Sequence, residues 1–268
     1  MKIYKYEATG NDFIMTTSSP NSPSDFARHW CDRHFGIGAD GLIFPHIDAQ
    51  GIHMRYYNAD GSIAPMCGNG MRAFVRFLND TGLLTKHSTT IKTLSGDVPI
   101  IAETDGTISV DLGRPQFELD ETLIQGGQSF LHPITLSAAG MHAEFLILNL
   151  GTIHAVHMVP SLDALDISQF GTAFCGHSMF PSKININAME MINSDHIRMK
   201  TYERGVGPTL SCGTGSAAAA VIAAQNSDAQ TIRVDVPGGT LRVEVNESVV
   251  LNGPARKIAT IEIEEEYQ

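Results

Sequence analysis

Residues 53–73 read HMRYYNADGSIAPMCGNGMRA, and residues 196–218 read HIRMKTYERGVGPTLSCGTGSAA. Each stretch begins with strand-like alternation, passes through a glycine-bearing turn and a proline, and ends in Cys-Gly-x-Gly before a helical run. The runs predict helices at 71–78 and 216–224. Because internal similarity is a sign of duplicated structure, we expect two similar halves with one Cys-Gly-x-Gly motif each.

Short strands dominate the rest of the chain. Alternating segments at 107–112, 144–149, 155–159 and 260–264 are typical of half-buried strands, and a long strand–helix–strand periodicity is absent from the sequence. We therefore predict an α+β fold rather than a doubly wound parallel sheet. The expected halves are 1–115 with Cys67 and 116–256 with Cys212, and the last strand, 257–268, is expected to return to the first half.

Composition excludes several classes of protein. The chain has 268 residues, 43% of them hydrophobic, and a formal net charge of −11 without a Lys/Arg-rich run, which argues against a nucleic-acid partner. The N-terminal stretch has no apolar signal core, and no segment approaches the ~20 apolar residues of a membrane span. We expect a cytoplasmic protein that does not enter a membrane.

Four cysteines are scattered at positions 31, 67, 175 and 212, and none forms a Cys-x-x-Cys pair. The spacing is typical of free thiols rather than of a zinc ribbon or a disulfide framework. Cys31 is expected in a helical stretch and Cys175 in an irregular segment, both as buried structural thiols. His154 and His157 have no carboxylate or cysteine at ligand spacing, so we predict no metal site.

The two remaining cysteines suit acid–base chemistry. A thiol at a helix N-terminus has a lowered pKa, and glycines beside it expose backbone N–H groups that can bind a carboxylate. Two such helix starts facing each other would leave one sulfur on each face of an α-carbon. One thiolate could then remove the α-proton while the opposite thiol donates another. A single motif of this kind could simply start a helix with a buried cysteine, whereas a duplicated pair favours catalysis.

At these residues the chain resembles diaminopimelate epimerases and their relatives over nearly its whole length. The matching blocks are Gly10-Asn-Asp-Phe, Cys31-Asp-Arg-His-Phe-Gly-Ile-Gly-Ala-Asp-Gly, Asn58-Ala-Asp-Gly-Ser, Met66-Cys-Gly-Asn-Gly-Met-Arg, Phe180-Pro, Tyr202-Glu-Arg-Gly and Ser211-Cys-Gly-Thr-Gly. The resemblance implies two pseudo-symmetric domains, each a mostly antiparallel sheet wrapped around a central helix. It also implies a homodimer and an amino-acid epimerase or racemase that needs no pyridoxal phosphate or other cofactor.

The resemblance implies a role for each matching position. Cys67 and Cys212 would be the catalytic base–acid pair. The reacting carboxylate would be bound by Gly68, Asn69, Gly213 and Thr214, with Asn11, His154 and Glu203 around the reacting centre. The far end of diaminopimelate would be held by Asn58, Asn185 and Arg204.

The chain departs from the family pattern beside the expected pocket. Gly151-Thr-Ile-His replaces the usual Gly-Asn-Pro-His, so Thr152 and Ile153 are candidate specificity residues. Diaminopimelate is the first candidate substrate, and another α-amino acid such as histidine is the alternative. A phenazine-biosynthesis-type isomerase, which works without the paired cysteines, ranks below both. A non-catalytic amino-acid-binding module that keeps only the helix-terminus amides is the remaining hypothesis.

Overall fold

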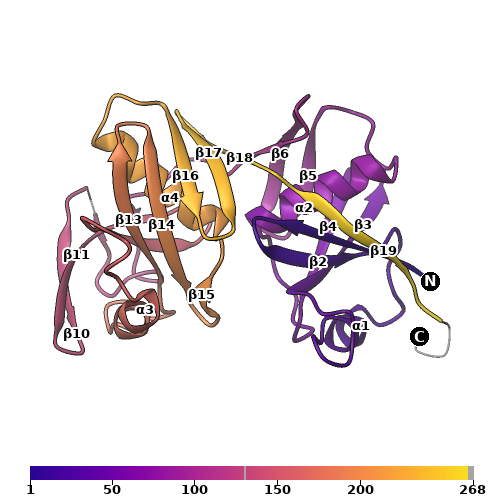
Figure 1. Cartoon of the computed structure of the whole chain (residues 1–268), viewed down its shortest axis with the longest axis horizontal. Helices are drawn as coiled ribbons and strands as arrows, with labels where there is room; N and C mark the ends of the chain where they lie inside the picture. Colours follow the sequence, from indigo (N-terminus) through magenta and orange to yellow (C-terminus); the bar gives the residue numbers. More distant parts are fainter. Residues whose placement is uncertain (130, 265–268) are drawn as a thin grey trace. The chain divides into compact units, whose positions relative to one another are not determined.

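A computed structural model describes residues 1–129 and 131–264, and side chains are described for these residues except 128 and 129. The chain divides into two compact units (Figure 1). Unit 1 comprises Met1–Asp111 together with the segment from Asn252 onward, and unit 2 is the continuous stretch Leu112–Leu251. The boundaries expected from the sequence, after 115 and after 256, stay a prediction. Residues 265–268 of the expected last strand lie outside the described part of the chain.

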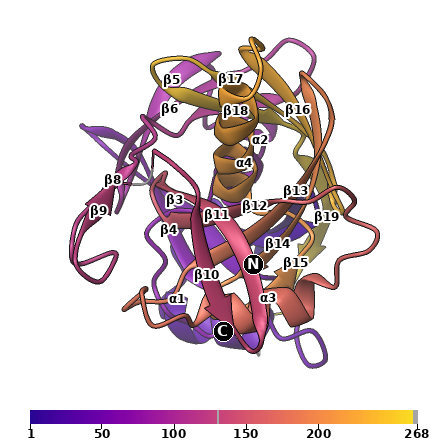
Figure 2. The ribbon, with the colours of Figure 1, turned by 90° about the vertical axis from the view of Figure 1, so that its left-hand side faces the viewer.

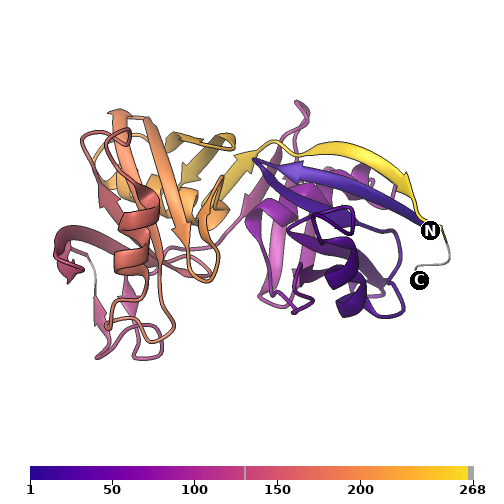
Figure 3. The ribbon, with the colours of Figure 1, turned by 60° about the horizontal axis from the view of Figure 1, so that its bottom comes forward.

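Unit 1 is a mixed, mostly antiparallel sheet with two helices. Its elements are β1 (Lys2–Ala8), β2 (Asn11–Met15), α1 (Pro23–Trp30), β3 (Gly41–Asp48), β4 (Gly51–Asn58), α2 (Gly68–Asp80), β5 (Ser88–Thr93), β6 (Gly96–Ala102), β7 (Ile108–Asp111) and β19 (Arg256–Glu262). The last of these, β19, pairs antiparallel with β1, and Figure 3 shows the two strands side by side.

Unit 2 also combines strands with two helices, α3 and α4. Its elements are β8 (Glu118–Leu119), β9 (Gln128–Ser129), β10 (Ile134–Ala138), β11 (Met141–Asn149), β12 (Ile153–Met158), α3 (Ile167–Cys175), β13 (Asn185–Asn193), β14 (His196–Glu203), β15 (Gly207–Thr209), α4 (Gly213–Gln225), β16 (Thr231–Val236) and β17 (Gly239–Val245). Strand β18 (Val249–Gly253) contains the second boundary between the units. No helix in the described residues is long and apolar enough to cross a membrane.

The strand pairings confirm that the fold is duplicated. In unit 1, β2 is parallel to β3, β3 is antiparallel to β4, β4 is parallel to β5, and β5 is antiparallel to β6. In unit 2, β12, β13, β14, β16 and β17 repeat this order of parallel and antiparallel pairs. One helix follows the first strand of each series, and one leads into the fourth. The predicted α+β fold of two pseudo-symmetric halves is therefore correct.

Each unit packs its strands around one long helix. Helix α2 contacts β1, β2 and β7, and helix α4 contacts β12, β16 and β17. Figure 2 shows α4 running through the middle of its unit with strands around it. The alanines at 217–220 and Ile222 are all buried in one apolar core, as expected for a helix that is apolar all round.

Both central helices begin three residues earlier than the hydrophobic pattern predicts. Cys67 and Cys212 are the N-cap residues, with extended backbone conformations, and the glycines after them form the first helical turn. The pattern alone missed this turn because glycine lowers helix propensity and carries no apolar side chain. Each cysteine is thus held at the N-terminus of a thirteen-residue helix.

One local prediction is wrong. The segment around Cys175, expected to be irregular, is the C-terminal part of helix α3. The side chain of Asp166 caps this helix by accepting hydrogen bonds from the N–H groups of Ser168 and Gln169. Gly171 reads as a helix breaker in the sequence, but it is required by packing, since a Cβ there would come within 2.1 Å of the Tyr202 ring.

Candidate active site

The sulfur of Cys67 lies among hydrogen-bonding groups at the start of α2. Its Sγ accepts from the N–H of Gly70 at 3.4 Å, and it lies 3.6 Å from Oδ1 of Asn11, to which the thiol donates. Cys67 is half-buried, whereas Gly68 and Asn69, which follow it in the first helical turn, are buried. The backbone N–H groups of this turn have no partner within the helix, so they and the helix dipole favour an anion there.

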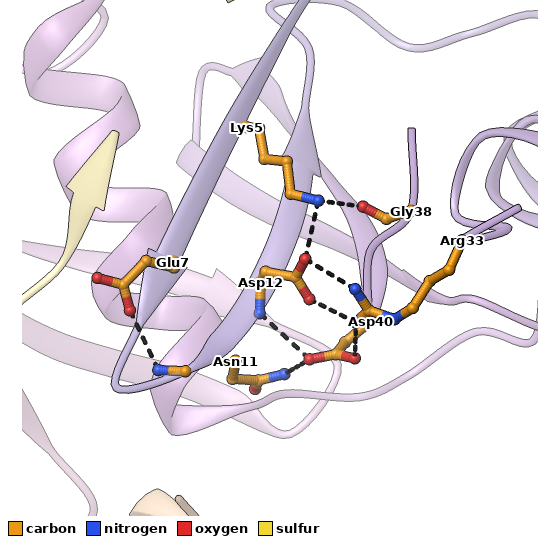
Figure 4. Close-up of polar contacts among 8 residues, drawn as sticks. Lys5, Glu7, Asn11, Asp12, Arg33, Gly38 and Asp40 are labelled. Carbon is orange, nitrogen blue, oxygen red and sulfur yellow. Dashed lines mark hydrogen bonds and ion pairs between the residues drawn. The ribbon is translucent and has the colours of Figure 1, made fainter. Parts of the chain in front are cut away.

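Asn11 is oriented by a cluster of charged residues on β1, β2 and the loop before β3 (Figure 4). Its side-chain N–H donates to Asp40, whose other oxygen accepts from Arg33 at 2.7 Å. Arg33 also pairs with Asp12, which in turn pairs with Lys5 at 2.9 Å. Because Asp40 takes the amide N–H, the amide oxygen of Asn11 is left directed at Cys67.

The charges of this cluster are set by their neighbours. Burial alone would raise the pKa of Asp12, but hydrogen bonds from Arg33 and Lys5 outweigh it and hold the pKa below its ordinary value. Asp12 is therefore ionised at neutral pH, and the cluster is a fixed set of ion pairs.

Arg72 brings a second charge to the Cys67 side. The residue is fully buried one turn into α2, and its guanidinium donates to Oγ1 of Thr9 at 3.0 Å and to the carbonyl of Pro254 at 3.4 Å. Burial lowers the pKa of Arg72 to about 10, and the negative charges of a Cys67 thiolate and of Glu7 act in the opposite direction. Arg72 is thus a cation at neutral pH, and a thiolate at Cys67 stabilises it.

Asn58 lies half-buried at the end of β4. Its side-chain N–H donates to Oγ of Ser62 at 2.9 Å, and its backbone N–H donates to the Ser62 carbonyl at 2.8 Å. These bonds close the turn after β4 and fix the Asn58 side chain at the end of the strand.

The sulfur of Cys212 lies beside an uncharged hydroxyl group. Its Sγ lies 3.6 Å from Oγ1 of Thr214, and that hydroxyl lies 3.0 Å from Nε2 of His154. His154 is fully buried on β12, and its Nδ1 faces the side-chain amide of Asn187 on β13 at 3.2 Å. The Asn187 oxygen accepts from the hydroxyl of Thr201 on β14 at 3.1 Å. Thr214, His154, Asn187 and Thr201 thus form a chain of hydrogen bonds that ends at the sulfur, and all of them except the half-buried Thr214 are buried.

His154 is neutral in this environment. Burial, followed by the positive charge of Arg204, lowers the pKa of His154 to about 3. A neutral imidazole donates through one ring nitrogen and accepts through the other. At neutral pH the imidazole therefore passes on a hydrogen bond without carrying charge.

A second polar group gathers at the start of β13. Asn185 accepts from the backbone N–H of Arg204 at 2.9 Å and donates to Oγ1 of Thr152 at 3.4 Å. The Arg204 side chain is exposed and donates to the carbonyl of Ser182 at 3.3 Å. The structure therefore brings together Asn185 and Arg204, two of the residues expected to bind the far end of the substrate, and the candidate specificity residue Thr152.

The two remaining candidates in unit 2 lie apart from this group. Glu203 is half-buried, and its Oε1 accepts from Oγ1 of Thr209 on the adjacent β15 at 2.6 Å. Ile153 is 2% exposed and belongs to the apolar core that includes Phe145 and Phe174. Of the pair at 152–153, only the threonine side chain therefore lies with the polar residues.

The other two cysteines are of a different kind. Cys31 and Cys175 are free and buried, as the sequence predicts for structural thiols. Burial raises the pKa of Cys31 to about 12 and also raises that of Cys175. Neither thiol ionises near neutral pH. Within the residues that the structure describes, no group of three or more His, Cys, Asp or Glu side chains has the arrangement of a metal site.

Sequence reasoning missed several residues that act on the two sulfurs through other side chains or through charge, namely Asp40, Arg72, Asn187 and Thr201. Arg72 follows the first motif, but a helical arginine usually reads as solvated. Asn187 and Thr201 lie on strands, and only the register of β13 against β12 and β14 shows what they touch. The alternation of polar side chains at the start of β13 was the one available signal.

Comparisons with known proteins agree over nearly the whole chain. The family model described as diaminopimelate epimerase matches residues 3–118 and 146–258. The diaminopimelate epimerase of Acaryochloris marina is 36% identical, with 97% of this chain and 97% of that protein aligned. The diaminopimelate epimerase of Halothermothrix orenii is also 36% identical, over 97% and 96% of the two chains.

Solved structures with a similar fold have lower sequence identity. A phenazine biosynthesis protein of the PhzF family from Bacillus anthracis has a TM-score of 0.70 at 17% identity, covering 98% of each chain. A hydroxyproline epimerase from Agrobacterium vitis, solved with bound trans-4-hydroxy-L-proline, has a TM-score of 0.67 at 16% identity, covering 97% of this chain and 91% of that one. At these identities the likeness establishes the fold.

Proposed function

The chain belongs to the diaminopimelate epimerase family, and we propose that it interconverts LL- and meso-diaminopimelate with Cys67 and Cys212 as the two proton-exchanging groups. The protein is an isomerase of the epimerase and racemase type. The observation that carries the proposal is that the two family cysteines are the N-caps of equivalent helices in duplicated units.

The chemistry follows from the helix starts. One sulfur, as a thiolate, takes the α-proton, and the other, as a thiol, delivers a proton to the opposite face, so that the configuration inverts. The substrate carboxylate would accept hydrogen bonds from backbone N–H groups of Gly68, Asn69, Gly213 and Thr214. The same amides and helix dipoles stabilise the negative charge that develops when the α-proton leaves. The reaction needs no pyridoxal phosphate in this scheme.

The neighbouring side chains support opposite roles for the two thiols at the start of a turnover. Asn11 and His154, the latter through Thr214, are the nearest side chains that orient the sulfurs. Glu203, whose carboxylate accepts a hydrogen bond from Thr209, would polarise a group at the same end of β14. In each direction of the reaction one cysteine must begin deprotonated and the other protonated.

The substrate assignment rests on the far end of the molecule. Diaminopimelate carries a second amino-acid head, and the guanidinium of Arg204 can pair with its carboxylate in two places. Asn185 and Thr152 lie beside that arginine, and Asn58 is the corresponding candidate in unit 1. Near-full-length relatives named diaminopimelate epimerase favour this substrate over histidine, the alternative that Thr152 and Ile153 raise.

A reaction in deuterated water tests both the reaction and the substrate. Under reducing conditions, LL-diaminopimelate should gain deuterium at one α-carbon and give the meso isomer, as followed by mass spectrometry and chiral chromatography. Histidine and the common L-amino acids serve as parallel substrates. Exchange with histidine but not with diaminopimelate would overturn the substrate assignment, and no exchange with any of them would overturn the reaction.

We also propose that the enzyme works as a cytoplasmic homodimer, as the family resemblance implies. Light scattering after gel filtration tests the assembly, with twice the mass of the 29.0 kDa chain expected. The mass of a single chain would contradict it.

A further inference from the structure

The hydrogen-bonded chain behind Cys212 contains two residues outside the recognised motifs. Thr201 and Asn187 lie on β14 and β13, and both are buried, with 3% and 0% exposed surface. Among the described residues, neither forms a hydrogen bond with Cys212; they reach it through His154 and Thr214. Their register positions face each other across the antiparallel pair, which places the threonine hydroxyl on the asparagine oxygen. A buried polar pair of this kind costs stability unless every group is satisfied.

The direction of the chain is fixed at Asn187. One N–H of its amide donates to the backbone carbonyl of Ala155 at 3.3 Å, and a carbonyl can only accept. The amide nitrogen therefore faces β12 and the amide oxygen faces Thr201. The second N–H of the same nitrogen points at Nδ1 of His154, which must then be the unprotonated ring nitrogen.

The tautomer of His154 carries this direction to the sulfur. With Nδ1 unprotonated, the neutral imidazole holds its proton on Nε2 and donates it to Oγ1 of Thr214. The Thr214 hydroxyl, having accepted on oxygen, has its own hydrogen free to donate to Sγ of Cys212. All four side chains thus point their donors toward the sulfur, and hydrogen bonding to a thiolate favours its ionised form.

The positions of unit 1 equivalent to His154, Asn187 and Thr201 are apolar or aromatic. Phe13 pairs with Gly41 as His154 pairs with Asn185, so Phe13 corresponds to His154. Counting two residues along β3 and β13 makes Ile43 the counterpart of Asn187, and its partner Tyr56 the counterpart of Thr201. The Phe13 and Tyr56 rings pack edge to face, with centroids 5.9 Å apart.

Packing under the helix repeats this contrast. A Cβ on Gly215 in unit 2 would come within 2.5 Å of Oδ1 of Asn187, whereas a Cβ on Gly70 in unit 1 would first meet Cδ1 of Ile43 at 3.1 Å. The fold can therefore be built with an apolar residue at the position of Asn187. The polar chain is a specific feature of the Cys212 side rather than a requirement of the scaffold.

We propose that Thr201 and Asn187 are positioning residues that lock the tautomer of His154, so that the Thr214 hydroxyl donates to the sulfur of Cys212. The inference rests on the proposed role of Cys212 in proton exchange. Arg204 acts on His154 through its positive charge and helps to keep it neutral, while Glu203 is engaged by Thr209. The chain itself contains no charged member at neutral pH.

The wild-type protein gives the first test. Nitrogen-15 NMR of the histidine ring nitrogens, with His154 assigned by its loss in a His154→Gln variant, should show Nε2 protonated and Nδ1 unprotonated at neutral pH. A proton on Nδ1 instead would reverse the chain and overturn the proposal. This measurement needs no turnover and no change to the residues in question.

Two variants give the second test, with the alkylation rate of Cys212 by iodoacetamide followed against pH by mass spectrometry. All proteins carry Cys67→Ser, which prevents a disulfide between the two thiols. Asn187→Leu is close in shape to the native side chain and should slow alkylation of Cys212 at pH 7 by about tenfold and move the pH midpoint upward. Thr201→Val, one step further from the sulfur, should slow it by about threefold.

Matched controls separate this role from simple packing. Thr201→Ser keeps the hydroxyl and should restore the wild-type pH profile. Met189→Leu changes a buried residue in the core around α4 that is not a member of the hydrogen-bonded chain, and it should leave the profile unchanged. An unchanged profile in both Asn187→Leu and Thr201→Val, or an equal shift in Met189→Leu, would overturn the proposal. If Asn187→Leu does not fold, the comparison of Thr201→Val with Thr201→Ser decides the question alone.

The outcome is distinguishable from failure of the proposed function. A shifted Cys212 profile in a protein that exchanges no substrate α-hydrogen would leave the positioning chain intact and refute the epimerase mechanism. Normal epimerisation by the wild type, together with an unchanged Cys212 alkylation profile in both variants, would support the epimerase mechanism and refute the positioning chain.

Discussion

At the start of α2 the residues behind the neighbours of the Cys67 sulfur are charged, whereas at the start of α4 the side chains hydrogen-bonded in line with the Cys212 sulfur are neutral. On the first side a buried arginine and the ion-paired cluster behind Asn11 set the field. On the second side a hydroxyl, a neutral imidazole and an amide stand in line. The backbone is duplicated, but the electrostatic surroundings of the two thiols are not.

This difference suits a reaction that needs two thiols in opposite states. A permanent cation favours a thiolate at Cys67 whatever the neighbouring protons do. A chain of neutral donors can support a thiolate at Cys212, and its last hydroxyl can also accept from a thiol, because a hydroxyl both donates and accepts. Identical surroundings would give the two sulfurs equal proton affinities and no preferred starting state.

Removing either sulfur is the strongest way to break the comparison. Cys67→Ser and Cys212→Ser should each lower epimerisation by about 10³-fold, because a serine hydroxyl is a far weaker base than a thiolate and general acid–base groups contribute about 10²–10⁴-fold. Conversion of LL-diaminopimelate to the meso isomer measures the loss, and circular dichroism checks the fold. Normal turnover in either variant would contradict the two-base mechanism.

The second prediction is that His154, on the Cys212 side, makes the free energy of unfolding depend on pH. His154 has a folded pKa lowered from 6.5 to about 3. The stability of its neutral form is complete above pH 6.5 and is lost as the pH falls toward 3, because only the unfolded chain then binds the proton. Between pH 7 and pH 5 this costs about 2 kcal/mol in the free energy of unfolding.

Urea unfolding of the wild type and of His154→Gln measures this loss. Other histidines contribute equally to both proteins, so the wild type should lose about 2 kcal/mol more than the variant over this range. Phe13, the counterpart of His154 in unit 1, has no titratable group. Equal pH slopes for the two proteins would show that His154 is charged or exposed in the native state.

A third prediction concerns the effect of the buried Arg72 cation on the reactivity of Cys67. Arg72→Met removes the buried cation and should slow alkylation of Cys67 at pH 7 by about tenfold while leaving Cys212 unaffected. Each rate is read in a background with the other thiol changed to serine. Arg72→Lys, which keeps a positive charge, is the control and should lie closer to the wild type. Equal slowing of both thiols would indicate a loss of structure rather than of charge.

The smallest expected difference concerns Gly70 and Gly215, the second glycine of each Cys-Gly-x-Gly motif. Gly215→Ala should lower the free energy of unfolding by about 1 kcal/mol more than Gly70→Ala, because the new methyl group meets the amide oxygen of Asn187, which accepts a hydrogen bond from Thr201. At Gly70 it meets the ends of the flexible Ile43 and Met54 side chains. Urea denaturation of the two variants decides, and equal losses would remove the packing distinction.

Much of this organisation could be predicted from the sequence, because it repeats. Two Cys-Gly-x-Gly motifs after strand-like stretches indicate the duplicated halves and both central helices. The hydrophobic pattern did not predict the first turns of those helices, because the glycines there lower helix propensity and carry no apolar side chain. Helix α3 was not predicted, because Gly171 resembles a helix breaker in the sequence. The glycine is required by its close packing against the Tyr202 ring, not by the local backbone conformation.

The surroundings of the sulfurs were harder to predict. Asn11 and His154 could be placed from the family resemblance, since they belong to recognisable blocks. Arg72 could not, because its burial depends on carbonyl and hydroxyl partners far away in the sequence. Asn187 and Thr201 depend on strand register, and an error of one residue would turn both side chains to the other face of the sheet.

The antiparallel pair of β1 and β19 has a consequence for synthesis on the ribosome. Unit 1 takes its first strand from one end of the chain and its last from the other, with all of unit 2 between them. While unit 2 is being translated, β1 lacks its outer neighbour and presents an open edge. Unit 2, being continuous, can complete its hydrogen bonding first. The half that emerges earliest is therefore the half that finishes folding last, and its edge is the region most exposed to mispairing in the nascent chain.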